Sequence, residues 1–87
     1  MVYYVYLIKT VEGYPKKSYV GYTNDLDKRI AKHNSNLGAK STKGYKWVLI
    51  YNKRFYKKNI AMSYEYKLKK DKKNRLLIKK NFLKWSK

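Results

Sequence analysis

The chain opens with a run of β-branched, aromatic and aliphatic side chains at positions 2–8. These side chains suit a pleated surface, so the run predicts a strand rather than a helix. Because side chains alternate along a strand, Tyr4, Tyr6 and Ile8 are expected on one face and the residues between them on the other.

A turn and a second strand are expected next. Glu12, Gly13 and Pro15 interrupt the apolar run, and residues 18–22 are again typical of a strand. The short connection predicts an antiparallel hairpin. Tyr19 is then expected on the strand beside the one that carries Tyr6.

Helix-capping residue types follow the second strand. Thr23 and Asn24 are favourable N-cap residues, and Asp25 and Asp27 then fall in a first turn where their charge complements the helix dipole. These residues predict that a helix begins here.

This helix is expected to have a buried side and a functional stripe next to it. Leu26, Ile30 and Leu37 mark the buried side. Arg29 and His33 are four residues apart, which places both on the neighbouring stripe, where they can act on one ligand.

The next segment predicts a loop and a third strand. Residues 34–44 contain Asn, Ser, Gly and Lys without apolar periodicity, which is typical of a mobile basic loop that can touch a phosphate backbone. Residues 47–51 are typical of a strand.

Two further helices complete the predicted fold, the last one capped by Asp71. Their apolar positions recur at helical spacing: Ile60, Ala61, Tyr64 and Leu68 in the first, and Ile78, Phe82 and Trp85 in the second. We therefore expect one domain, residues 1–87, of the α/β (α+β) class. Its small three-stranded, mostly antiparallel sheet is flanked by about three helices.

Charge then narrows the choice of partners. The chain has 23 Lys and Arg against 5 Asp and Glu, a formal net charge of +18. A polyanion would relieve the resulting self-repulsion, and Lys and Arg release condensed counterions from nucleic-acid phosphates. Nucleic acid is the expected partner, with an anionic membrane surface as the rival. The apolar share of 44% and the aromatic share of 17% are too high for a disordered basic tail.

Missing features exclude several other classes. With no cysteine, the chain has no disulfide, thiolate metal site or cysteine nucleophile. No stretch approaches the roughly 20 apolar residues that span a bilayer, and the amino terminus lacks the features of a secretion signal. We expect a cytoplasmic protein without membrane association or a small-molecule cofactor.

One carboxylate is left without a local role. The other four acidic residues are accounted for by helix starts and a turn: Asp25, Asp27, Asp71 and Glu12. Glu65 lies on the apolar stripe of its predicted helix, where a carboxylate is costly unless it is paired or metal-bound. An ion pair with Lys69 at i, i+4 and a role as metal ligand are both open.

Arg29 and His33 together suit phosphodiester hydrolysis. An arginine can clamp phosphate while an imidazole moves a proton. The alternatives are a purely structural histidine and one more solvated cation. Most of the 11 tyrosines are explained by strand propensity and packing, and exposed ones can stack on bases.

The order of these residues resembles the GIY-YIG nucleases. Tyr4-Val5-Tyr6 and Tyr19-Val20-Gly21 are similar to the paired tyrosine motifs of that family, although Tyr4 replaces the glycine of the first motif. The family's first helix carries an arginine and often a histidine, which Arg29 and His33 match. A later helix carries its metal-binding glutamate, which Glu65 matches.

The resemblance covers nearly the whole chain, from residue 2 to about residue 73. Gly38-Ala39-Lys40 resembles the short stand-alone bacterial members. Some members also use a late asparagine, for which Asn81 is the candidate here. Gly21 is interpreted as a backbone position that brings the helix start close to the site.

The resemblance implies a metal-dependent endonuclease that hydrolyses phosphodiester bonds in DNA and is structure-specific and repair-related. It implies one Mg²⁺ or Mn²⁺ ion on Glu65, charge neutralisation by Arg29, and water as the nucleophile. Tyr6 or Tyr19 would activate the water directly or through His33. The lysines expected to contact DNA or RNA are Lys32, Lys40, Lys43 and Lys46.

Two other functions stay open. A charge density beyond the needs of catalysis favours a non-catalytic DNA- or RNA-binding module that keeps the fold. The basic last helix favours a cationic protein that binds anionic membrane surfaces. The oligomeric state is not indicated by the sequence.

Overall fold

The computed structural model describes residues 1–85, with side chains described through residue 83. Its sheet has the strand order β2-β1-β3, with both neighbouring pairs antiparallel. The strands are β1 (Tyr3–Thr10), β2 (Ser18–Thr23) and β3 (Trp47–Phe55). The expected three-stranded α/β architecture is confirmed.

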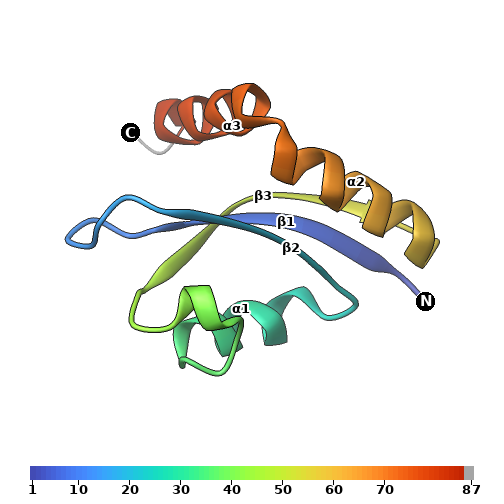
Figure 1. The fold of residues 1–87 in the computed structure, drawn as a ribbon, viewed down its shortest axis with the longest axis horizontal. Helices are drawn as coiled ribbons and strands as arrows, with labels where there is room; N and C mark the ends of the chain where they lie inside the picture. Colours follow the sequence, from blue (N-terminus) through green and yellow to red (C-terminus); the bar gives the residue numbers. More distant parts are fainter. Residues whose placement is uncertain (86–87) are drawn as a thin grey trace.

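The helices form one layer on each side of the sheet (Figure 1). On one side lie α1 (Leu26–Asn34) and the 3₁₀ turn η1 (Lys40–Thr42). On the other side lie α2 (Lys58–Lys70) and α3 (Lys72–Trp85). In the described part of the chain, no helix is both long enough and apolar enough to cross a bilayer.

The central strand β1 is buried on both faces, which explains its unbroken apolar sequence. Val5 and Leu7 pack against Ala61 and Leu68 of α2. The opposite face holds a second cluster of buried residues, which contains Tyr6, Ile8 and Trp47 and packs against Leu26 and Ile30 of α1. The predicted alternation of side chains along β1 is therefore confirmed.

The third strand is longer than its sequence pattern predicted. It continues past residue 51 to Phe55, which pairs with Tyr3. The added residues Asn52, Lys53 and Arg54 are exposed and polar, so hydropathy does not reveal that they belong to a strand. Backbone pairing with β1 sets the length of this strand.

The start of α1 differs from the prediction by one or two residues. Asp25 is the N-cap, and its carboxylate accepts a hydrogen bond from the Lys28 backbone N–H at 3.2 Å. The Thr23 hydroxyl accepts instead from the Asp25 backbone N–H at 3.1 Å. Asp27 lies in the first turn, as expected.

The expected burial of Leu37 was wrong. α1 ends at Asn34, and the chain reverses at Asn36, which has a φ of 65°. Leu37 therefore lies beyond the helix and is 73% exposed. The prediction continues the helical spacing past the end of α1, because periodicity alone does not detect the turn at Asn36.

The segment 34–44, predicted to be a mobile basic loop, contains a short helical turn and several hydrogen bonds. It contains η1, and Thr42 in it is fully buried. The Asn34 side chain accepts from the Trp47 backbone N–H at 2.6 Å and donates to the Trp47 carbonyl at 3.1 Å. Asn36 accepts from Gly44 N–H at 2.8 Å.

The two carboxy-terminal helices are joined at Asp71. Its carboxylate accepts from the Asn74 backbone N–H at 3.0 Å, which confirms the predicted cap. Ile60 was expected in the buried stripe of α2 but is 49% exposed, since α2 buries the sides of Ala61 and Leu68 instead. The side chain of Trp85 lies outside the described residues.

Leu68 and Leu77 test the packing of the outer helices. Leu68 is 2% exposed in the α2 core and Leu77 is 53% exposed on α3. We expect Leu68→Ala to lower the free energy of unfolding by about 2–5 kcal/mol, because it leaves a cavity. Leu77→Ala should change it by less than about 0.5 kcal/mol. Urea denaturation measures both, and equal losses would contradict this packing.

Candidate active site

Two phenols lie side by side on the α1 face of the sheet. Tyr6 is fully buried at the centre of β1, and Tyr19 is half-buried on β2. Tyr6 pairs with Gly21 and Ile8 pairs with Tyr19, so the two tyrosines are diagonal neighbours. Their ring centroids are 6.4 Å apart. The expected placement on adjacent strands is confirmed.

Gly21 is needed because the Tyr6 phenol occupies the place of a side chain. A Cβ atom at position 21 would lie 2.5 Å from the Tyr6 hydroxyl oxygen and 2.7 Å from its ring. Gly38 has the same relation to His33, since a Cβ there would lie 2.5 Å from Nδ1. Both glycines leave room for a buried polar ring.

His33 links the phenol to the segment after α1. Its Nε2 atom is 2.8 Å from the Tyr6 hydroxyl, and its Nδ1 atom is 2.9 Å from the Thr42 hydroxyl. Thr42 also donates to the Ala39 carbonyl at 2.8 Å. All three side chains of this chain of contacts, Tyr6, His33 and Thr42, are fully buried.

These contacts fix the positions of the protons. A hydroxyl has one hydrogen, and Thr42 gives it to a carbonyl, so Thr42 can only accept from His33. His33 must then carry its proton on Nδ1 and keep a lone pair on Nε2. Tyr6 consequently donates its hydroxyl hydrogen to His33.

Burial keeps this pair neutral. Burial first, and the positive charge of Arg29 second, lower the pKa of His33 to about 4. Burial raises the pKa of Tyr6 to about 12, although the Arg29 hydrogen bond acts in the opposite direction. The pair is therefore a neutral acid hydrogen-bonded to a neutral base at physiological pH.

Arg29 connects the buried pair to the surface. Its Nε donates to the Tyr6 hydroxyl at 3.4 Å, and contacts with Tyr6 first and Tyr19 later raise its pKa, partly offset by burial. Arg29 also lines a pocket of about 320 Å³ beside the start of α1. The other lining residues are Tyr22, Thr23, Asn24, Asp25, Lys28 and Lys32.

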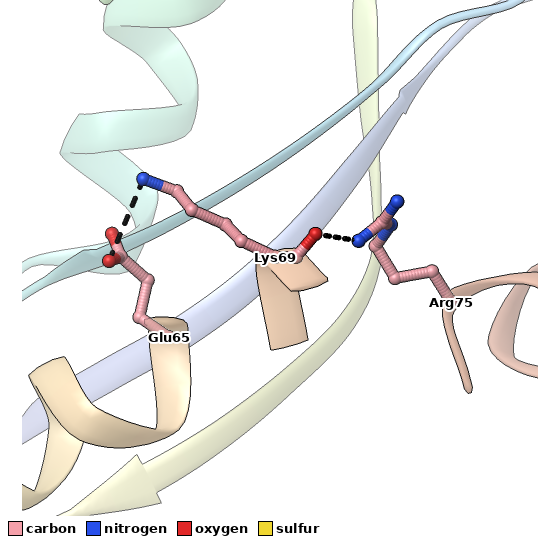
Figure 2. Close-up of polar contacts among 3 residues, drawn as sticks. All are labelled: Glu65, Lys69 and Arg75. Atoms are coloured by element: carbon pink, nitrogen blue, oxygen red, sulfur yellow. Dashed lines mark hydrogen bonds and ion pairs between the residues drawn. The ribbon is translucent and has the colours of Figure 1, made fainter. Parts of the chain in front are cut away.

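Glu65 lies on α2, in the helical layer on the opposite side of the sheet from the two phenols. Its side chain is 17% exposed and lies 3.7 Å from the Lys69 ammonium, so the i, i+4 ion pair, one of the two alternatives, forms (Figure 2). Its charge is also near enough to raise the pKa of Tyr6. This influence is minor beside burial, which is the main cause of the raised pKa of Tyr6.

Four of the five expected catalytic residues are thus clustered, and Glu65 is linked to them by charge. The expected phosphate-contacting lysines are more dispersed. Lys32 lines the α1 pocket, Lys40 and Lys43 are exposed at η1, and Lys46 donates to the Asn34 carbonyl at 2.8 Å.

Among the described residues, the carboxylates to consider for a metal ion are Glu65 and Asp25, which lines the α1 pocket but already caps α1. Among the described side chains, no group of three or more His, Cys, Asp or Glu residues lies together. Glu65 is paired with the Lys69 ammonium, so a metal ion on its carboxylate would have to share it with Lys69 or displace that ammonium. Asn81, the other residue considered, is exposed on α3.

Comparison with known proteins assigns the fold. A family model described as the GIY-YIG catalytic domain matches residues 2–81. This chain belongs to the GIY-YIG family. The sequence resemblance is confirmed, and GIY-YIG domains are typically endonucleases, so membership implies nuclease activity at a general level.

Similar proteins are named as UPF0213 proteins. One from Bacillus pumilus is 44% identical over 68 residues, covering 77% of this chain and 66% of that protein. One from Clostridium perfringens is 43% identical over 75 residues, covering 85% and 77%. A solution NMR structure of a UPF0213 protein from Bacillus halodurans has a TM-score of 0.48 and 38% identity, covering 88% of this chain and 83% of that one.

Thr42 is the residue of this GIY-YIG domain that sequence reasoning missed. It stands in a polar segment that has no periodicity, and nothing local marks one threonine as buried. Gly38 was noted in the resemblance, but its reason is the room it leaves for His33. Both residues act through contacts across the α1–η1 turn.

The low pKa of His33 predicts a dependence of stability on pH. The unfolded chain takes up a proton near pH 6.5, whereas folded His33 stays neutral down to about pH 4. This contribution to stability is therefore complete above pH 6.5 and is lost as the pH falls toward 4. NMR titration can follow it directly, since the chain has one histidine. An imidazole that titrates near pH 6.5 would contradict the assignment.

Thr42 predicts the tautomer of His33. At pH 7, ¹⁵N NMR should show protonated Nδ1 and unprotonated Nε2. Thr42→Val keeps the shape but leaves the buried Nδ1–H without its acceptor, so we expect a loss of about 1–3 kcal/mol in unfolding free energy. Thr42→Ser retains the hydroxyl and serves as the control. Equal stability and an unchanged ¹⁵N spectrum in both variants would refute the proton assignment.

Proposed function

We propose that this protein is an endonuclease that hydrolyses phosphodiester bonds in DNA, using one Mg²⁺ or Mn²⁺ ion held by Glu65. The observation that carries the proposal is the continuous contact from Arg29 through Tyr6 to His33, in a chain of the GIY-YIG family. We further propose that residues 1–87 form one catalytic domain that acts in the cytoplasm on branched or flapped repair intermediates.

Exposure separates the roles of the site residues. Tyr6 and His33 are fully buried, so the proposed reaction requires substrate binding to admit one water molecule to the Tyr6 hydroxyl. Tyr19 and Arg29 are half-buried and can contact a phosphate. Arg29 neutralises the charge that develops on the phosphate oxygens, and Tyr19 positions the attacking water.

The buried pair receives the proton. Tyr6 passes its hydroxyl hydrogen to Nε2 of His33 and takes a hydrogen from the water, whose oxygen then bonds to phosphorus as the leaving oxygen departs. A pKa of about 12 means that Tyr6 is not a phenolate at neutral pH. It transfers a proton onward to His33 rather than acting as the final base.

Glu65 suits a divalent ion because Mg²⁺ commonly binds through one or two carboxylates and completes its shell with water and phosphate oxygens. The chemistry that such an ion supplies is a lower pKa for water and neutralisation of phosphate charge. A single carboxylate, Glu65, fits one ion rather than two.

The test compares Glu65→Gln with Glu12→Gln, an exposed position in the β1–β2 turn. Cleavage of plain, branched and flapped DNA, and of RNA, is measured with Mg²⁺ or Mn²⁺ and with EDTA. We expect Glu65→Gln to slow cleavage by about 100-fold or more while DNA binding is kept. Glu12→Gln should match the wild type, and equal rates in the two variants would reject the site.

A second function is favoured by the net charge of +18. A non-catalytic module that binds DNA or RNA through counterion release would need no acid near the phenols. Salt-sensitive binding without cleavage in any of these metals would select this function instead.

A further inference from the structure

A second pocket opens along the edge strand β2. Its volume is about 240 Å³, and it is lined by Ser18, Tyr19, Val20, Lys69 and Arg75. The α1 pocket is lined by the last two residues of the same strand, Tyr22 and Thr23, and by Asn24 after it. Gly21, against which the Tyr6 phenol lies, separates the two. Tyr19 and Tyr22 are about 10 Å apart along a strand, so the two pockets follow one another along the edge of the sheet.

The second pocket brings together the chemistry that recognises phosphate. Two of its lining residues are cations, Ser18 carries a hydroxyl group, and none is acidic. Arginine and lysine bind phosphate by charge and by hydrogen bonds, and hydroxyls commonly add contacts to the backbone of nucleic acids. A sugar-phosphate strand fits this lining better than an apolar or cationic ligand does.

The two cations are held in place by the rest of the fold. Lys69 pairs with Glu65 at 3.7 Å, and Arg75 donates from Nη1 to the Leu68 carbonyl at 2.9 Å and to the Lys69 carbonyl. Figure 2 shows the other guanidinium nitrogens directed away from the Lys69 carbonyl. Because these side chains are partly ordered already, less entropy is lost when they bind a ligand.

We propose that Lys69 and Arg75, together with Ser18, form a second phosphate subsite that holds the nucleic-acid strand beside the scissile phosphate. This inference rests on the proposed function. The strand then runs along β2 from the α1 pocket, past Gly21, to the junction of α2 and α3. This path passes Lys69 and therefore brings the strand next to Glu65, the acid in the opposite helical layer.

Lys69→Gln and Lys67→Gln form a matched pair for the test. Both lysines are exposed on α2 and both changes remove one charge, but only Lys69 lines the pocket. Binding of a short flapped DNA is measured in EDTA over a range of KCl concentrations. We expect Lys69→Gln to reduce the slope of log affinity against log salt by about one, with Lys67→Gln close to the wild type. Equal slopes for the two variants would overturn the subsite.

An uncharged linkage in the DNA backbone can show which phosphate contacts Lys69. Methylphosphonates, which lack the phosphate charge, are introduced one at a time along the bound strand. At one linkage, the effects of the methylphosphonate and of Lys69→Gln should be non-additive, because both remove the same contact. Additive effects at every linkage would also overturn the proposal.

The two proposals can fail separately. If cleavage depends on Glu65 but the salt slopes of Lys69→Gln and Lys67→Gln are equal, the subsite is rejected and the endonuclease proposal stands. A Lys69-specific change in slope without cleavage supports the subsite and rejects the endonuclease. Arg75→Lys is a second variant that retains the positive charge near the end of α2, and we expect it to weaken binding less than Lys69→Gln does, because the charge binds the phosphate.

Discussion

The hydrogen bond between Tyr6 and His33 is the contact on which the arrangement of the site depends. Two polar rings are buried at the centre of the sheet, and a buried polar group is costly unless its partners are supplied. Each ring nitrogen and the phenol oxygen has a partner, and in the described part of the chain no buried side-chain polar atom lacks one. The surrounding residues are arranged to make these contacts possible.

This requirement extends into segments that contribute no chemistry. Glycines at 21 and 38 leave the space that the two rings fill. Thr42 is held by η1 and by Trp47, whose indole N–H donates to the Thr42 carbonyl at 3.0 Å. The segment after α1 therefore has to be ordered, because a free loop could not hold the Thr42 hydroxyl against Nδ1. A polar-looking connection thus belongs to the core of the site.

Much of the framework could be predicted from sequence, because local patterns determine it. Alternation along β1 correctly separated Tyr6 from Val5 and Leu7, and i, i+4 spacing put Arg29 and His33 on one side of a helix. The role of Thr42 and the exposure of Leu37 could not be predicted in this way. Both depend on the turn at Asn36, which periodicity does not report. For Glu65, helical spacing left an ion pair with Lys69 and a role as metal ligand open. The structure contains the ion pair with Lys69, and the charge of Glu65 has a minor effect on the pKa of Tyr6.

The distribution of charge explains how a strongly basic protein can keep a neutral proton acceptor. Charged groups stay at the edge of the site, and Arg29 stands at the boundary, with one side on the Tyr6 hydroxyl and the other in the α1 pocket. Burial is the larger cause of the low pKa of His33, and the positive charge of Arg29 is the smaller one. In the proposed reaction, a phosphate bound against Arg29 offsets that charge, so the pKa of His33 rises when substrate is present. Bound substrate would then make His33 a stronger base for the hydrolysis of that substrate. In the free protein His33 stays neutral, so the core contains no buried charge at this position.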